Sequence, residues 1–123
     1  MIIGVGVDII EIDRIEKAAS KERFIERVFT RAEREYWQRM HCAAQTLAGA
    51  FAAKEAVAKA FGTGIGEIKW QDIEILHTQN NQPYVALHGQ AAVQMDIMNA
   101  QKAHISISHS KQYAVAQAVL ESK

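Results

Sequence analysis

The pattern of hydrophobic and polar positions changes several times along the chain, and each change marks a predicted element. The stretch IIGVGVDI at positions 2–9 is almost entirely apolar, with Gly4 and Gly6 alternating with Ile and Val. This composition predicts a buried strand whose backbone comes close to another segment at both glycines. From about Glu11 to Val28 the apolar residues recur at helical spacing, and we expect Ser20 to divide this segment into two short helices.

A helix start and a long helix follow. Thr30 and Glu33 form the sequence signature of a capping box, in which each side chain bonds the backbone of the other residue. A long helix is predicted from about Ala43 to Phe61, and Gly62 is expected to end it.

The second half of the chain is richer in strands. Four segments read as strands, at 68–78, 84–89, 103–110 and 113–121. We expect a turn at 79–83, a short helix at 90–100 and a closing hairpin around Ser110 to Gln112. Helices thus dominate the first half and antiparallel strands the second, with one strand leading, and this order predicts an α+β fold.

Composition and charge narrow the class of protein. With 123 residues, the chain is expected to form one domain, 1–123, and its 14 basic and 14 acidic residues argue against a nucleic-acid binder. The single cysteine, Cys42, allows no internal disulfide, which fits a reducing compartment such as the cytoplasm. We expect no signal peptide and no membrane span, because no apolar run approaches about 18 residues.

The stretch FAAKEAVAKA at positions 51–60 holds the first candidate site residues, Glu55 and Lys59. At a spacing of four they could form an ordinary solvated ion pair worth about 0.2–0.5 kcal/mol. Ala48, Ala52 and Ala56 lie on the same side of the predicted helix, however, and residues this small allow another chain segment or a ligand to come close. Both interpretations stay open at this point.

Asp8 is the second candidate carboxylate, because it follows an apolar strand. Magnesium is usually held by one or two carboxylates, while substrate phosphates and water complete its shell. A lysine nearby can contact a phosphate as a point charge. Asp8, Glu55 and Lys59 have the chemistry for such a site, although the spacing alone does not bring them together.

The glycine-rich FGTGIG and the histidines of HISISHS are weaker signals. Gly62 is explained as a helix end, whereas Gly64 and Gly66 exceed what an end needs and could allow close contact with a ligand. In a regular strand His104 and His109 point to opposite faces, which makes them a poor metal pair. His109, at the strand end, is the better candidate for a ligand contact.

Basic residues gather near the start of the first helical segment. Arg14, Lys17 and Lys21 share one helical face and Arg23 follows them, with glutamates interspersed. The face is either an ordinary mixed solvated surface or a docking surface for an acidic protein partner.

Taken together, the motifs resemble a known family. GVGVDIIEIDRIE, RVFTRAE, FAAKEAVAKAFGTGIG and HISISHSKQYAVAQAV occur in this order and span nearly the whole chain. They resemble the holo-acyl-carrier-protein synthases, the small bacterial branch of the 4′-phosphopantetheinyl transferases. The resemblance implies that family's fold, a long helix packed on a small, mainly antiparallel sheet. It also implies transfer of 4′-phosphopantetheine from coenzyme A to a serine of apo acyl carrier protein, in support of fatty acid biosynthesis.

The resemblance further implies roles for individual residues. Mg²⁺ would be held by Asp8 and Glu55, and Lys59 would lie near the reacting phosphates. The coenzyme A cleft would include Gly62, Thr63, Gly64 and, from a neighbouring subunit of a homotrimer, His109. The acyl carrier protein would dock on the surface formed by Arg14, Lys17, Lys21 and Arg23.

One position departs from the family pattern, and some questions stay open. Ala50 stands where relatives often carry an arginine just before FAAKE. The proton acceptor stays open between a water held by the metal and a carboxylate. Two other functions compete with the transferase: a non-catalytic module that binds carrier protein or coenzyme A, and a magnesium-dependent hydrolase of nucleotide pyrophosphates.

Overall fold

Helices fill the first half of the chain and strands most of the second, as the sequence predicts. The computed structural model describes all 123 residues. In chain order the elements are β1 (Ile2–Glu11), α1 (Ile12–Ala19), α2 (Glu22–Val28), α3 (Arg31–Arg39), α4 (Ala44–Ala60), the short 3-10 helix η1 (Trp70–Asp72), β2 (Ile73–His77), β3 (Pro83–Leu87), α5 (Gly89–Ile97), β4 (Ala100–His109) and β5 (Tyr113–Ser122).

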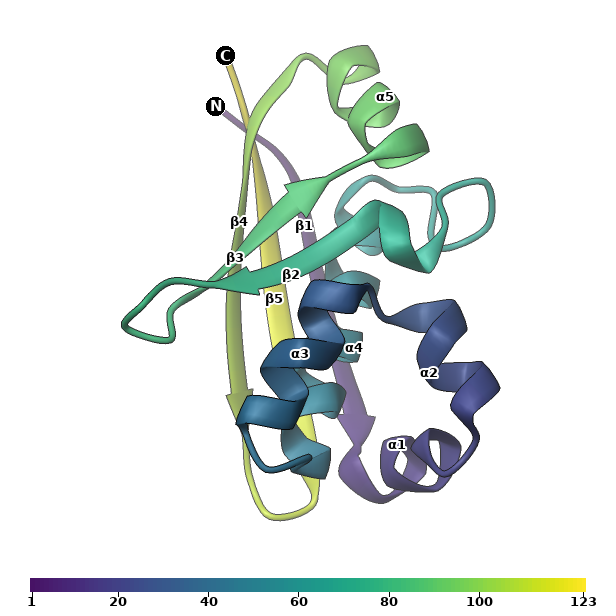
Figure 1. Ribbon diagram of the computed structural model, residues 1–123. Helices are drawn as coiled ribbons and strands as arrows, with labels where there is room; N and C mark the ends of the chain where they lie inside the picture. Colours follow the sequence, from purple (N-terminus) through teal and green to yellow (C-terminus); the bar gives the residue numbers. More distant parts are fainter.

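The strands form two antiparallel sheets (Figure 1). The larger sheet has the order β1-β5-β4, so the first strand of the chain pairs with the last. In its register Asp8 lies opposite Ala116, which lies opposite Ile107. The smaller sheet is the β2-β3 hairpin, and the expected hairpin of β4 and β5 is closed by a bond from Ser110 N to Tyr113 O at 2.8 Å.

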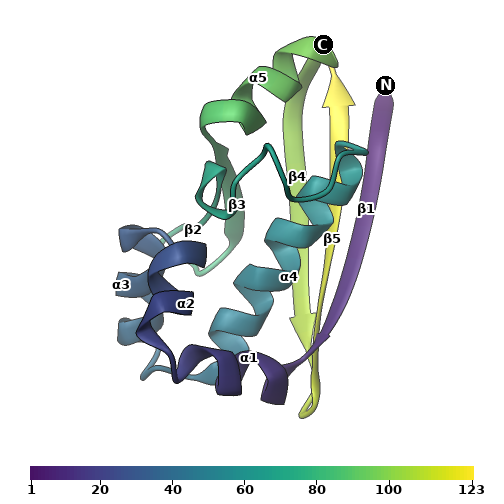
Figure 2. The same cartoon turned by 90° about the vertical axis from the view of Figure 1, so that its right-hand side faces the viewer.

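The long helix α4 lies against one face of the larger sheet (Figure 2). Several of its alanines, including Ala52 and Ala56, are fully buried and pack in one core with Ala116 and Ala118 of β5. A side chain at Gly6 would overlap the carbonyl oxygen of Ala56, which confirms the predicted close backbone approach. Small residues on both surfaces therefore let the helix sit very near the strands, and the alanine face accommodates another chain segment.

The predicted division near Ser20 is confirmed. A bend at Ser20 and Lys21 separates α1 from α2. Ile15 of α1 and Ile25 of α2 are buried in one cluster with Leu47, near the start of α4. The capping box at the start of α3 is also present, because Thr30 and Glu33 each bond the backbone of the other.

Some predicted boundaries are wrong. The strand expected from residue 68 begins only at Ile73, because Asp72 Oδ2 accepts a bond from Lys69 N at 3.0 Å and closes the tight turn η1. Asp8 lies within β1 and not at its end, since the strand continues to Glu11. Pro83 opens β3 in place of ending the turn.

The outer face of the larger sheet carries no helix (Figure 2). On β1 this face presents Val5, Val7 and Ile9, each with 58% or more of its surface exposed. No helix in the structure has both the length and the apolar character needed to cross a lipid bilayer.

Candidate functional site

Asp8 and Lys59 meet at the edge where β1 crosses α4. Lys59 Nζ donates to Asp8 Oδ1 and to Val7 O, each at 3.0 Å. The close approach of helix and strand at Gly6 makes this contact, which spans 51 positions in sequence, possible. The side chain of Lys59 remains half exposed, and its third N–H has no partner in the protein.

Glu55 faces the same place from α4. Burial raises the pKa of the Glu55 carboxyl, the negative charge of Asp8 raises it further, and the positive charge of Lys59 opposes the shift. The two carboxylates therefore lie close enough for their charges to interact, and such a pair is suitable for a divalent cation. The ordinary ion pair between Glu55 and Lys59 that the spacing allowed is not formed, because the lysine bonds Asp8 instead.

The donor set fits magnesium better than a closed metal site. No cluster of three or more His, Cys, Asp or Glu side chains in the chain could hold a metal ion by itself. Two carboxylates that are both only partly buried match a cation that keeps water and phosphate ligands, as Mg²⁺ does.

The glycine loop, defined here as residues 62–69, continues from the end of α4. Gly62 and Gly64 have φ of +80° and +68°, and a side chain at either would meet nothing within 4 Å. These glycines are therefore required by the backbone conformation and leave their surroundings open. Thr63 and Gly64 also line a cavity of about 190 Å³ shared with Gln90 and Gln94 of α5.

His109 lies on the other flank of α4. It lines a cavity of about 370 Å³ together with Gln45, Ala50, His77 and other residues. Its strand, β4, contacts the helix near Gly49, where a side chain would touch Ile107, whereas Asp8 lies on β1 beyond β5. Within one chain, His109 is thus not brought together with the carboxylates.

The remaining predicted residues are placed as follows. His104 lies beside Glu121, with 3.2 Å between Nε2 and Oε1. The four basic candidates, Arg14, Lys17, Lys21 and Arg23, are all exposed, but the first two lie on α1, Lys21 caps α2 and Arg23 lies within α2. The single row that the helical spacing predicted is therefore interrupted by the bend between the two helices.

A hollow of about 480 Å³ lies between α2 and the glycine loop. Its lining consists of Arg27, Ile65, Gly66, Lys69 and Trp70. Two basic side chains and an indole at its wall make it suited to an acidic and partly apolar partner.

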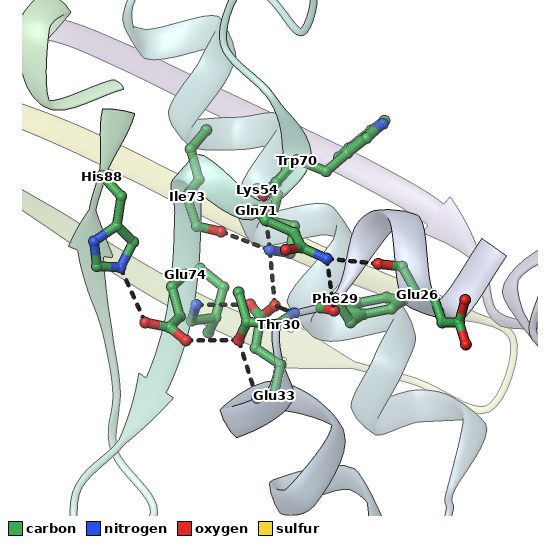
Figure 3. A network of polar contacts seen from close by, with 11 residues as sticks. Glu26, Phe29, Thr30, Glu33, Lys54, Trp70, Gln71, Ile73, Glu74 and His88 are labelled. Carbon is green, nitrogen blue, oxygen red and sulfur yellow. Dashed lines mark hydrogen bonds and ion pairs between the residues drawn. The ribbon is translucent and has the colours of Figure 1, made fainter. Parts of the chain in front are cut away.

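A buried polar network between α3, α4 and β2 was not predicted from the sequence (Figure 3). Lys54 is completely buried, and its Nζ donates to Trp70 O at 2.9 Å and Ile73 O at 2.6 Å and pairs with Glu33 Oε1 at 2.9 Å. Glu33 Oε2 in turn accepts a bond from Ile75 N at 2.8 Å. The network joins α3, α4, η1 and β2.

Burial raises the pKa of Glu33 and lowers the pKa of Lys54, and the attraction between their charges opposes both shifts. A signal for this pair does exist in the sequence. The segment around Lys54 is apolar on nearly every face, so a charge within it must be buried and must find partners.

The fold and the site define a class: a small α+β protein with an acidic pair, a lysine and a glycine loop, suited to binding a phosphate ester. The chain belongs to the 4′-phosphopantetheinyl transferase superfamily, whose sequence model matches residues 4–118.

Relatives with known roles cover the full chain. The chain is 52% identical over 120 residues to the holo-[acyl-carrier-protein] synthase of Alkaliphilus oremlandii, covering 97% of this chain and 98% of that protein. It is 49% identical over 122 residues to the corresponding synthase of Natranaerobius thermophilus, covering 98% of each.

Solved structures show the same fold. The synthase of Helicobacter pylori, in complex with coenzyme A, has a TM-score of 0.83 and 36% identity, covering 95% of this chain and 99% of that one. The synthase of Bacillus anthracis, in complex with CoA (3′,5′-ADP), has a TM-score of 0.81 and 42% identity, covering 100% of this chain and 99% of that one.

Proposed function

We propose that this protein transfers 4′-phosphopantetheine from coenzyme A to a serine of apo acyl carrier protein, giving holo acyl carrier protein and adenosine 3′,5′-bisphosphate. The observation that carries the proposal is the meeting of Asp8, Glu55 and Lys59 at one edge of the fold. The full-length likeness to synthases, two of them solved with coenzyme A or its product, supports the same conclusion.

In this proposal Asp8 and Glu55 hold one Mg²⁺. The support for it is that the charges of the two carboxylates interact and that both side chains are only partly buried. When bound there, Mg²⁺ would supply positive charge beside the phosphates of coenzyme A.

Lys59 is proposed to stabilise the same developing charge. The carrier serine oxygen bonds the β-phosphorus and gives up its proton to a base. The P–O bond to adenosine bisphosphate breaks, and its electron pair stays on the leaving oxygen. Lys59 is fixed to the strand by two bonds and keeps one N–H for a phosphate oxygen. The work of the protein is therefore mainly positioning and electrostatic stabilisation.

The acyl carrier protein is proposed to dock on α1 and α2. Arg14, Lys17, Lys21 and Arg23 are exposed there, and the hollow beside the glycine loop adds Arg27 and Lys69. Positive charge at this surface complements an acidic partner and speeds its association.

We further propose that the protein works as a homotrimer with sites between subunits. The exposed apolar face of β1 offers a surface that a second copy can bury. In such an assembly His109, together with Gly62, Thr63 and Gly64 of the neighbouring subunit, would contact coenzyme A. The separation of His109 from Asp8 within one chain fits this arrangement.

One experiment tests the function. The protein is incubated with coenzyme A, Mg²⁺ and an apo acyl carrier protein, and the carrier is weighed by mass spectrometry. A gain of one phosphopantetheine is expected. Hydrolysed coenzyme A with an unmodified carrier would indicate the hydrolase, and no change in either would indicate a binding module.

Removal of divalent cations tests the metal. Transfer is expected to stop in EDTA and to return when Mg²⁺ is added in excess, while the circular dichroism spectrum stays the same, because the carboxylates are not part of the core. Full transfer after exhaustive chelation would contradict the assignment of Asp8 and Glu55 as metal ligands.

A further inference from the structure

Trp70, where the chain returns from the glycine loop, is held at two points on α4. Its carbonyl accepts a hydrogen bond from Lys54 Nζ at 2.9 Å, and its indole stacks on Phe51 with ring centroids 4.8 Å apart. Phe51 and Lys54 are three positions apart and therefore neighbours on the helix surface. The backbone and the side chain of Trp70 are thus fixed to the same helical turn.

The other end of the glycine loop is fixed to the same helix. Gly62 N donates to Lys59 O at 2.9 Å, and Gly64 N donates to Ala58 O at 3.1 Å. The loop therefore leaves α4 at its C-terminus and returns about two turns earlier along it. Between these attachments Ile68 is buried in the core and Ile65 packs against it, whereas a side chain at Gly62, Gly64 or Gly66 would meet nothing within 4 Å. The glycine-rich part of the loop is therefore held mainly through its two ends.

Lys54 makes the return attachment specific. An ammonium group has three N–H donors, and here all three have acceptors: Trp70 O, Ile73 O and Glu33 Oε1 (Figure 3). Because the side chain is fully buried, no water can replace a lost acceptor without opening the core. The positions of the two carbonyls relative to α4 are thereby closely determined.

We propose that Lys54 is a positioning residue, which holds the returning end of the glycine loop at a fixed place on the helix that carries Glu55 and Lys59. Its consequence for coenzyme A rests on the proposed function, whereas the attachment of the loop does not. Lys54 contacts no reacting atom and acts through Trp70 and the loop. The same ammonium orients β2 through the carbonyl of Ile73.

Three variants separate this role from general stability. Lys54→Met keeps an unbranched side chain of similar length but removes the bonds to Trp70 and Ile73. Glu33→Met/Lys54→Met also removes the carboxylate that would otherwise stay buried without its cation, so it protects the experiment from simple unfolding. Glu33→Gln is the matched control, because it disturbs the same network but leaves the lysine bonded to both carbonyls.

Two measurements are made on each purified full-length variant: amide hydrogen exchange at residues 62–69, and KM for coenzyme A alongside kcat. In both variants that lack Lys54, we expect loop exchange and KM to rise about tenfold, with kcat changing by less than about threefold. In Glu33→Gln we expect a lower thermal midpoint with loop exchange and KM within about twofold of the wild type.

Wild-type exchange in the glycine loop of the double variant would overturn the proposal. Equal changes in KM for Lys54→Met and Glu33→Gln at matched stability would also overturn it, because they would indicate a general structural effect. If the wild-type protein transfers no phosphopantetheine, the proposed function fails, and the exchange comparison still decides whether Lys54 holds the loop.

Discussion

At the scale of single residues, Lys59 determines which charges meet at the edge of the sheet. It bonds a carboxylate that is 51 positions away in sequence and leaves Glu55, one turn back on its own helix, without an ion pair. Glu55 therefore stays available to a cation, and its neighbour Lys54 is committed to the core. The adjacent residues Lys54 and Glu55 thus lie on different faces of α4, one in the core and one at the candidate site.

Replacing Glu55 tests the assignment of the metal ligands. Glu55→Gln is expected to lower kcat by about a hundredfold or more, because the proposed cation would lose one of its two carboxylate ligands. The thermal midpoint should change little, since the side chain is only partly buried. Glu35→Gln, at an exposed ion pair on α3, is the control and should leave kcat unchanged. Near-wild-type transfer by Glu55→Gln at saturating Mg²⁺ would contradict the assignment.

His77 makes a predictable contribution to stability as a function of pH. It stacks on Tyr36 with ring centroids 3.7 Å apart. Burial, and then the charge of Arg39, lowers the pKa of His77 below its ordinary value of 6.5. The unfolded chain therefore binds a proton more readily than the folded one, so this stability is complete above about pH 6.5 and is lost as the pH falls towards the folded pKa.

The corresponding test uses His77→Phe, which keeps an aromatic ring against Tyr36. Between pH 7.5 and 5.5 the thermal midpoint of the wild type is expected to fall further than that of the variant, because the variant has no proton to take up at this position. Parallel pH profiles for the two proteins would show that the histidine titrates normally in the fold.

At the scale of elements, the contact between α4 and β1 holds the site together. This contact depends on Gly4 and Gly6, whose missing side chains admit the carbonyls of Ala60 and Ala56. Because Asp8 and Glu55 come from the two contacting elements, the spacing of the carboxylates is set by this packing. Gly4 and Gly6 therefore determine the geometry of the proposed metal site as well as the packing of the fold.

Gly6→Ala is expected to destabilise the fold by about 3 kcal/mol, because the added methyl group overlaps a backbone carbonyl that cannot move aside without shifting the helix. Denaturant unfolding measures this change. Gly66→Ala is the matched control, since a side chain there meets nothing within 4 Å, and it should change stability by less than about 0.5 kcal/mol. Equal stabilities for the two variants would contradict the close packing.

Many features of the fold can be predicted from short stretches of sequence, whereas the arrangement of the candidate site cannot. The capping box at Thr30, the bend at Ser20 and the helix end at Gly62 follow from a few neighbouring residues, and all three predictions are confirmed. The partner of Lys59 and the burial of Lys54 depend on how α4 is rotated against strands that are distant in sequence. Periodicity predicts that a helix has faces, but only packing decides what each face contacts.

At the scale of the whole molecule, the uncovered face of the larger sheet is the feature that a single chain does not explain. Val5, Val7 and Ile9 form an apolar stripe along β1, and an assembly of copies would remove it from water. If active sites are shared between subunits, as proposed, a change that prevents assembly should also abolish transferase activity.

Val7→Asp is expected to convert the proposed trimer to monomers, because a charge in an apolar interface stays unpaired, and transfer should be lost with it. Light scattering coupled to size-exclusion chromatography reports the mass, and circular dichroism reports the fold. Ile97→Asp, at another strongly exposed apolar residue on α5, is the control and should leave the mass unchanged. An unchanged mass for Val7→Asp would place the interface elsewhere.

The pairing of β1 with β5 has a consequence for how the protein folds. Both chain ends lie at one end of the larger sheet (Figure 1), where Ser122 N donates to Met1 O at 2.8 Å. β1 pairs only with β5 in this sheet, and its partners, such as Ala114 opposite Ile10, lie about 100 positions later in the sequence. The helix α4 packs on both strands, so its packing surface is complete only when they have paired. The rate of folding is therefore expected to be limited by closing the long loop between these two strands.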